Sequence, residues 1–140
     1  MNVQLLEESF DVLAPRSEEL VAVFYGNLFV QAPHVSPLFA HVDMKRQREM
    51  LLATLVLLRK SLRNLDAIVP KLRELGARHV AYGATPEAYP VVGQVLIGSM
   101  AQVAGSAWRD EYAEAWGEAF AVVQAAMLEG AESAGQAVAA

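Results

Sequence analysis

The sequence contains no cysteine, which excludes disulfide bonds, thiolate metal sites and thiol nucleophiles. It also lacks an excess of basic residues, since 11 Lys and Arg stand against 16 Asp and Glu, giving a formal net charge of -5. Binding to a nucleic-acid backbone needs a clustered surplus of positive charge, so we expect no nucleic-acid partner. The first residues, MNVQLLEESF, carry acids where a signal peptide carries Lys or Arg, so we expect no export signal. These absences are compatible with a cytoplasmic protein.

Runs that alternate apolar and polar residues, as half-buried strands do, are also missing. Apolar residues make up 54% of the chain and recur at spacings of three and four, which is typical of helices with one buried face. A length of 140 residues suits one domain. We therefore predict an all-α fold in a single domain over 1–140, with a core at about 2–130 and a frayed tail at 131–140.

Six prolines divide this pattern, because proline lacks a backbone donor and disfavours helix in the residue before it. The sequence predicts a short turn-rich piece at 34–40 and longer helices at 2–14, 16–32, 44–63, 66–82, 86–105 and 109–130.

One stretch, 88–108, carries no formal charge and is long enough to cross a bilayer. Glycine, serine and glutamine side chains together with Pro90 make it too polar for the interior of a membrane. We expect it to be a buried helix, without membrane insertion.

A histidine shares the apolar face of the predicted helix 66–82. Leu72, Leu75 and His79 follow one another at helical spacing, so the imidazole points inward with the leucines. Two interpretations stand open for His79: a core or boundary histidine with its hydrogen bonds satisfied, or a functional ligand.

A second polar group begins the apolar face of the predicted helix 44–63, where Gln47 precedes Leu51 by one turn. Aromatic residues gather nearby in the sequence, among them Tyr25 and Phe39. A buried tyrosine hydroxyl needs a hydrogen-bond partner, and Tyr25 can meet Gln47 if the two helices cross.

Known catalytic patterns are not found in the sequence. No two histidines have metal-ligand spacing on one helix, and neither a nucleophile elbow nor a phosphate-binding loop is present. We therefore assign no catalytic residue.

The acidic pairs 7–8, 18–19 and 110–111 are interpreted as first-turn residues favoured by the helix dipole. An apolar helical box with one inward histidine remains, and this is the inventory that a haem site requires.

The sequence resembles the bacterial globins, specifically the single-domain type related to the haem domain of flavohaemoglobins. The resemblance covers nearly the whole chain, and four segments carry it in the expected order: FYGNLFVQAPHVSPLF (24–39), NLDAIVPKLRELGARHVAYG (64–83), YPVVGQVLIGSM (89–100) and AWGEAF (115–120).

The resemblance implies a globin fold packed around haem b. It implies that His79 is the proximal axial ligand of the haem iron, that Phe39 stacks on the porphyrin, and that Tyr25 donates to bound dioxygen. Gln47 and Leu51 match positions of the distal helix.

Three further residues match less specific positions near the expected haem. Tyr89 resembles a proximal-side tyrosine, or it is simply a packing residue. Arg78 and Tyr82 flank the proximal ligand and could reach the haem propionates, although an exposed basic residue on a helix is the alternative for Arg78.

The implied function is reversible binding of dioxygen and other diatomic gases, nitric oxide and carbon monoxide included. One alternative is detoxification by nitric oxide dioxygenation with electrons from a separate reductase. Another is a haem-based sensor or a structural globin without haem.

The sequence departs from the resembling family near the end of the last helix. Flavohaemoglobin-type domains have a glutamate there that pairs with the proximal histidine and tyrosine, but the matching position here is Ala131. Glu129 and Glu132 lie beside it, and a helical offset could let either acid reach the site. If neither does, we expect His79 to bond a backbone carbonyl, which weakens the donation of electron density to the iron.

Overall fold

A computed structural model describes the backbone of residues 1–139 and the side chains of residues 1–135. The all-α prediction is confirmed, because these described residues form helices and no strand. The α-helices are α1 (Val3–Leu13), α2 (Ser17–Gln31), α3 (Met44–Ser61), α4 (Val69–Ala81), α5 (Ala88–Ala104) and α6 (Asp110–Ala139). Short 3-10 helices connect some of them: η1 (Ala14–Arg16), η2 (Pro33–Phe39), η3 (Leu65–Ile68) and η4 (Gly105–Ala107).

Local sequence explains where several helices begin and end. The Asn2 side chain accepts a bond from the backbone amide of Leu5 and caps α1, and Asp43 caps α3 through the amides of Lys45 and Arg46. Such caps satisfy backbone donors that have no partner within the helix. Gly105, with φ of +59°, ends α5 in a conformation that glycine adopts at little cost.

Two predicted boundaries differ from the structure. The segment expected as one helix over 66–82 is divided into η3 and α4, with Pro70 in the first turn of α4, where its missing amide hydrogen is tolerated. The last helix does not end at 130 but continues to Ala139, because the tail lacks proline and is rich in alanine, the best helix former. Fraying of this tail stays a prediction.

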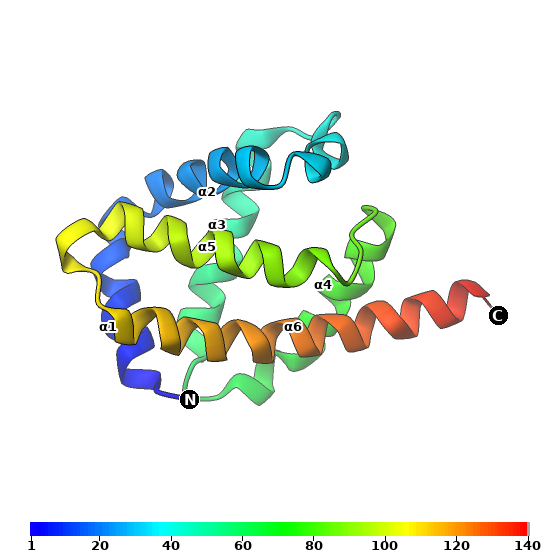
Figure 1. Ribbon diagram of the computed structural model, residues 1–140. Helices are drawn as coiled ribbons and strands as arrows, with labels where there is room; N and C mark the ends of the chain where they lie inside the picture. Colours follow the sequence, from blue (N-terminus) through cyan, green and yellow to red (C-terminus); the bar gives the residue numbers. More distant parts are fainter. Residues whose placement is uncertain (140) are drawn as a thin grey trace.

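Helices α5 and α6 run side by side in opposite directions across the molecule (Figure 1). Helix α2 packs on α5, α4 packs against α6, and α1 contacts both α3 and α6. The last turns of α6 extend beyond the other helices (Figure 1). The segment that carries His79 is thereby supported from one side by α6.

One buried hydrogen bond joins the first helix to the last. The indole Nε1 of Trp116 donates to the hydroxyl of Ser9 at 2.8 Å, and both side chains are fully buried. The Ser9 hydroxyl in turn donates to the carbonyl of Leu5 at 2.8 Å. The polar atoms of this core contact are therefore satisfied.

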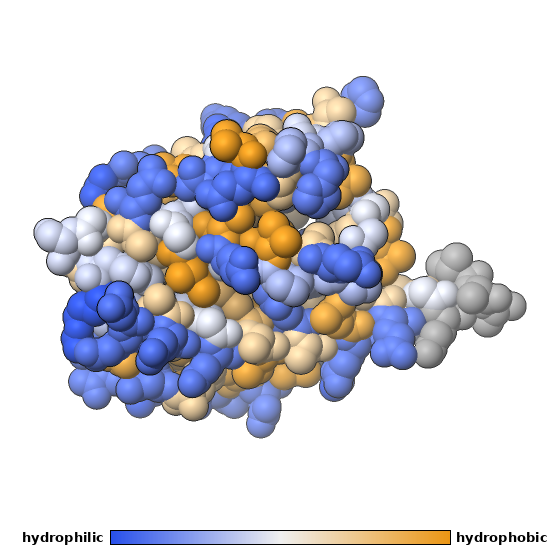
Figure 2. All heavy atoms as spheres, in the orientation of Figure 1, coloured by the Kyte–Doolittle hydropathy of each residue, from blue (hydrophilic) through white to orange (hydrophobic). Residues whose placement is uncertain are grey.

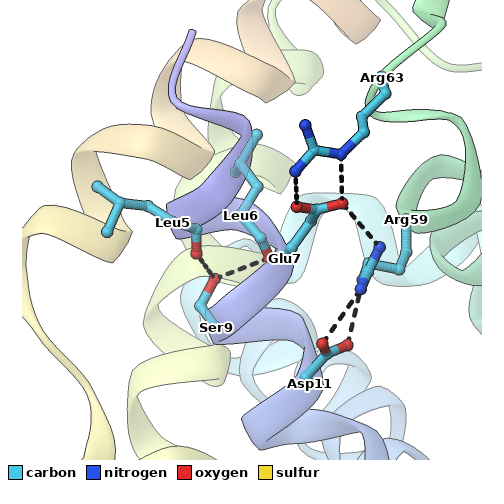
Figure 3. A network of polar contacts seen from close by, with 7 residues as sticks. All are labelled: Leu5, Leu6, Glu7, Ser9, Asp11, Arg59 and Arg63. Carbon is cyan, nitrogen blue, oxygen red and sulfur yellow. Dashed lines mark hydrogen bonds and ion pairs between the residues drawn. The ribbon is translucent and has the colours of Figure 1, made fainter.

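An ion-pair cluster joins α1 to Arg59, in the last turn of α3, and to Arg63, just beyond that helix (Figure 3). Glu7 pairs with Arg63 at 2.6 Å and with Arg59 at 3.3 Å, and Asp11 pairs with Arg59 at 3.1 Å. The interpretation of the acidic pair 7–8 as first-turn residues is wrong for both Glu7 and Glu8, since the first turn of α1 holds no acid. The acids at 18–19 and 110–111 do lie in first turns.

The uncharged stretch 88–108 forms mainly α5, whose Val95, Leu96, Met100 and Val103 are buried in the core. Within the described part of the chain, no helix combines the length and apolar character needed to cross a membrane. On the face drawn in Figure 2, hydrophilic side chains surround a central group of apolar ones.

Candidate functional site

His79 lies near the end of α4, on the helix face that also carries Leu72 and Leu75. Leu72 is buried, whereas Leu75 and His79 are half-buried. The ring Nδ1 lies 2.7 Å from the backbone carbonyl oxygen of Leu75. A carbonyl oxygen can only accept, so Nδ1 carries the proton and donates. The other ring nitrogen, Nε2, is left with its lone pair free.

The surroundings of His79 favour the neutral imidazole. Burial lowers its pKa below the ordinary value of 6.5, the charge of Arg78 lowers it further, and the bond to the Leu75 carbonyl only partly opposes these effects. A neutral imidazole is the form that binds a metal. At neutral pH, Nε2 of His79 is therefore ready to act as a ligand.

Tyr25 and Gln47 meet where α2 contacts α3, as the sequence predicts. The amide Nε2 of Gln47 donates to the hydroxyl oxygen of Tyr25 at 3.1 Å. Because this bond uses the oxygen as an acceptor, the phenolic hydrogen of Tyr25 is available for another partner. Tyr25 is buried, with 6% of its surface exposed. Water therefore competes little with another partner for this hydroxyl.

Burial also sets the protonation state of Tyr25. Desolvation raises its pKa above the ordinary value of 10.0, while the Gln47 bond and the charge of Arg48 oppose the rise. The hydroxyl therefore keeps its hydrogen at neutral pH. The sequence does not show that the charge of Arg48 acts on Tyr25, because there Arg48 is only the residue after Gln47.

Three phenylalanine rings surround the Tyr25 ring. The ring centroids of Phe24, Phe39 and Phe29 lie 4.8, 5.7 and 6.2 Å from that of Tyr25. Phe39 comes from η2 and also packs edge-on against Phe29 at 5.3 Å. The aromatic cluster holds Tyr25 in place and brings Phe39 to it from a separate segment.

The remaining predicted residues lie around His79 in different ways. The rings of Tyr82 and Tyr89 have centroids 5.5 and 6.3 Å from the imidazole, but Tyr82 is exposed and Tyr89 is buried. Arg78 is exposed and pairs with Glu74 one turn earlier on α4, at 3.1 Å. This pair agrees with the alternative given for Arg78. Leu51 is half-buried and packs against the core.

Neither acid beside position 131 bonds the imidazole. Glu129 pairs with Arg73 at 3.0 Å, and its side chain is 61% exposed. Glu132 is exposed and lines the same surface groove of about 360 Å³ as Arg73 and Glu129. His79 instead bonds the Leu75 carbonyl, as the sequence leads us to expect when neither acid reaches it.

The chain matches a known protein family over most of its length. A family model described as Globin matches residues 22–127. The chain belongs to the globin family. The match includes most of α2 and all of η2, α3, α4 and α5, and these elements carry every predicted site residue.

This globin resembles longer proteins as well as single-domain ones. It is 30% identical over 128 residues to a flavohemoprotein of Bacillus thuringiensis, an alignment that covers 90% of the chain but 31% of the relative. The chain thus spans about a third of such relatives. Two of the solved structures that share its fold are described next.

The first solved structure is an engineered carbene transferase built on a proposed nitric oxide dioxygenase of Rhodothermus marinus. It has a TM-score of 0.83 and 24% identity, over 98% of this chain and 93% of that one. The second is a bacterial globin of Campylobacter jejuni, with a TM-score of 0.80 and 21% identity, over 94% of each chain.

The donor chemistry of this globin fits a haem. A haem iron takes one strong axial nitrogen in an apolar setting, and the proximal imidazole commonly donates its other ring hydrogen to a nearby acceptor. His79 presents such a nitrogen and has its Nδ1 hydrogen engaged by the Leu75 carbonyl. Tyr25 adds a buried hydroxyl with a free hydrogen on a separate helix.

The sequence did not predict that α4 packs directly on the backbone of α6. Gly76 lies on α4 and Gly130 on α6, and a Cβ at either position would overlap backbone atoms of the other helix. An isolated glycine inside a helical pattern costs about 1 kcal/mol relative to alanine, so its presence can indicate a packing reason. Gly76, three residues before His79, carries that signal.

Proposed function

We propose that this globin binds haem b with His79 as the proximal axial ligand and reversibly binds dioxygen and other diatomic gases. The observation that carries the proposal is the bond between Nδ1 of His79 and the Leu75 carbonyl. It fixes the tautomer whose Nε2 can ligate iron. The globin and flavohemoprotein relatives support the same cofactor.

The residues around the site have distinct roles in this proposal. Haem, when bound, supplies an iron that holds a diatomic gas. The free hydrogen of the Tyr25 hydroxyl is donated to the gas, and Gln47 orients that hydroxyl. In a dry site this hydroxyl would favour dioxygen, which takes on partial negative charge and accepts a charge-assisted bond, over the less polar carbon monoxide. Phe39 and Leu51 supply apolar contact.

The test is replacement of the proposed ligand. We expect His79→Ala to lose haem uptake and the Soret band, because the remaining histidines, His34 and His41, are exposed residues outside α4. The matched controls His34→Ala and His41→Ala should take up haem as the unaltered protein does. Titration with haem followed by absorption spectroscopy measures all four. Unchanged uptake and an unchanged spectrum in His79→Ala would contradict the proposal.

A second candidate is nitric oxide dioxygenation, the activity proposed for the Rhodothermus marinus protein whose engineered form shares this fold. In this reaction nitric oxide, dioxygen and one electron give nitrate, and a separate reductase supplies the electron. The buried Tyr25 hydroxyl would again orient dioxygen. Mixing the dioxygen-equilibrated globin with nitric oxide and measuring nitrate tests the chemistry. Continued consumption of reduced nicotinamide cofactor with a cellular reductase tests turnover, and a single stoichiometric burst would favour gas binding alone.

A further inference from the structure

At two glycines, helices α4 and α6 lie so close that backbone meets backbone. At Gly76, an added Cβ would overlap the carbonyl oxygen of Met127 and come within 2.6 Å of its Cα. Real Cβ atoms do not approach backbone this closely, and helix backbone cannot yield as a flexible side chain can. Gly76 is therefore the residue that permits the contact.

A second contact of the same kind lies one turn away. A Cβ on Gly130 would overlap the carbonyl oxygen of Arg73 and lie 2.7 Å from its Cα. Going back along α4 from Gly76 to Arg73 corresponds to going forward along α6 from Met127 to Gly130. The two helices thus pass in opposite directions with backbone against backbone over a full turn, which fixes α4 along and around its axis.

Gly76 is bonded directly to Leu75, the residue whose carbonyl accepts from His79. The carbonyl of Leu75 that accepts from Nδ1 at 2.7 Å is part of the peptide group whose nitrogen belongs to Gly76. Peptide groups are planar, so a displacement of Gly76 moves the Leu75 oxygen with it. A continuous path therefore runs from Met127 through Gly76 and Leu75 to the imidazole.

We propose that Gly76 is a positioning residue for His79: by letting α4 lie directly on the backbone of α6, it sets the Leu75 carbonyl that orients the imidazole. The consequence for iron rests on the proposed haem function, whereas the orientation of the imidazole does not. Any side chain at 76 must push α4 off α6 or rotate it. The Leu75 carbonyl then leaves the position that fixes the Nδ1 hydrogen.

The main experiment compares Gly76→Ala with two glycine-to-alanine controls. Gly98 of α5 and Gly117 of α6 have nothing within 4 Å of an added Cβ, so Gly98→Ala and Gly117→Ala make the same chemical change without a clash. Resonance Raman spectroscopy of the haem-loaded ferrous proteins gives the iron–histidine stretching frequency. We expect a shifted and broadened band in Gly76→Ala and the unaltered band in both controls. The unaltered band in a folded Gly76→Ala would overturn the proposal.

If Gly76→Ala does not fold, Gly130→Ala provides a second test of the same helix crossing. Its clash lies with Arg73, two residues before Leu75 and outside the peptide group of the Leu75 carbonyl, so we expect a smaller band shift in the same direction. Loss of stability without any shift in this variant would show a purely structural contact and would overturn the positioning role.

A haem-free measurement separates this proposal from the proposed function. Nitrogen NMR of the haem-free protein reports which ring nitrogen of His79 carries the proton. We expect the Nδ1–H tautomer to dominate in the unaltered protein and both glycine controls, and to lose population in Gly76→Ala. A haem-free protein with this pattern that takes up no haem would leave the positioning intact and refute the haem function. Equal tautomer populations in all variants would refute the positioning.

Discussion

At the scale of single residues, the Tyr25 hydroxyl is the group whose chemistry is most constrained. Its oxygen accepts from Gln47 at 3.1 Å, and its ring is packed by three phenylalanines. The hydroxyl hydrogen therefore points away from the Gln47 amide. Because the Tyr25 side chain is already fixed by packing, it loses little rotamer freedom when its hydroxyl donates to a partner. A gas held near Tyr25 therefore meets a preoriented donor.

Removal of this donor should speed the release of dioxygen. We expect Tyr25→Phe to lose about 1 to 3 kcal/mol from one charge-assisted hydrogen bond, which corresponds to a rate at least about fivefold higher. Stopped-flow displacement measures the dissociation rate. Tyr112→Phe, which removes a hydroxyl from another buried tyrosine, on α6, is the matched control. An unchanged dissociation rate in Tyr25→Phe would remove the hydroxyl from the binding role.

The raised pKa of Tyr25 predicts a pH dependence of stability. The pKa is near 10.0 in the unfolded chain and higher in the folded one, so above pH 10 the unfolded state releases a proton that the folded state keeps. The free energy of unfolding should therefore fall as pH rises from about 10 towards the folded pKa. Urea titrations at several alkaline pH values measure the slope, and Tyr25→Phe should flatten it. The same Tyr-to-Phe change at the exposed Tyr82 serves as the control.

At the scale of elements, α3 is held differently at its two ends. Its first turns carry Gln47 towards Tyr25, whereas its last turns carry Arg59 into the cluster on α1. The carboxylate of Asp11 raises the pKa of Arg59, so the guanidinium keeps its charge at any pH at which the protein is studied. Helix α1 thus braces the end of α3 that is remote from the site.

A double-mutant cycle tests this brace. For Glu7→Gln and Arg59→Met we expect a coupling of about 0.5 to 1 kcal/mol in the free energy of unfolding, because the pair is only partly exposed and belongs to a network. Urea unfolding at low and high salt measures it, and salt should weaken the coupling. The Arg109–Glu111 pair is more exposed and serves as the control. Equal couplings for the two pairs would contradict a bracing role.

Most elements could be predicted from the sequence because their signals are local. Proline spacing and apolar periodicity indicate the helices, and capping residues such as Asp43 explain their starts. The end of α6 could not be placed this way, since the tail contains neither a stop signal nor large apolar residues. The role of Glu7 was missed for a different reason. Its partners, Arg59 and Arg63, are distant in sequence, and nothing in the local pattern connects them.

At the scale of the whole molecule, the difference between local signals and contacts distant in sequence also explains which parts of the site could be predicted. The inward direction of His79 and the contact between Tyr25 and Gln47 follow from helical faces and from the need to satisfy a buried hydroxyl. The support of His79 by α6 does not, because it depends on how closely two helix backbones approach. Only three-dimensional packing shows that Gly76 and Gly130 serve one crossing.

The bond between Trp116 and Ser9 gives the molecule an internal optical reporter. Trp116 is fully buried with its indole nitrogen engaged at 2.8 Å, whereas Trp108 is half-buried. Ultraviolet emission from Trp116 should shift to longer wavelength when water reaches the junction of α1 and α6. A porphyrin absorbs where tryptophan emits, so cofactor entry should quench the same signal. One fluorescence trace can thus follow both loosening of the first helix and loading of the protein.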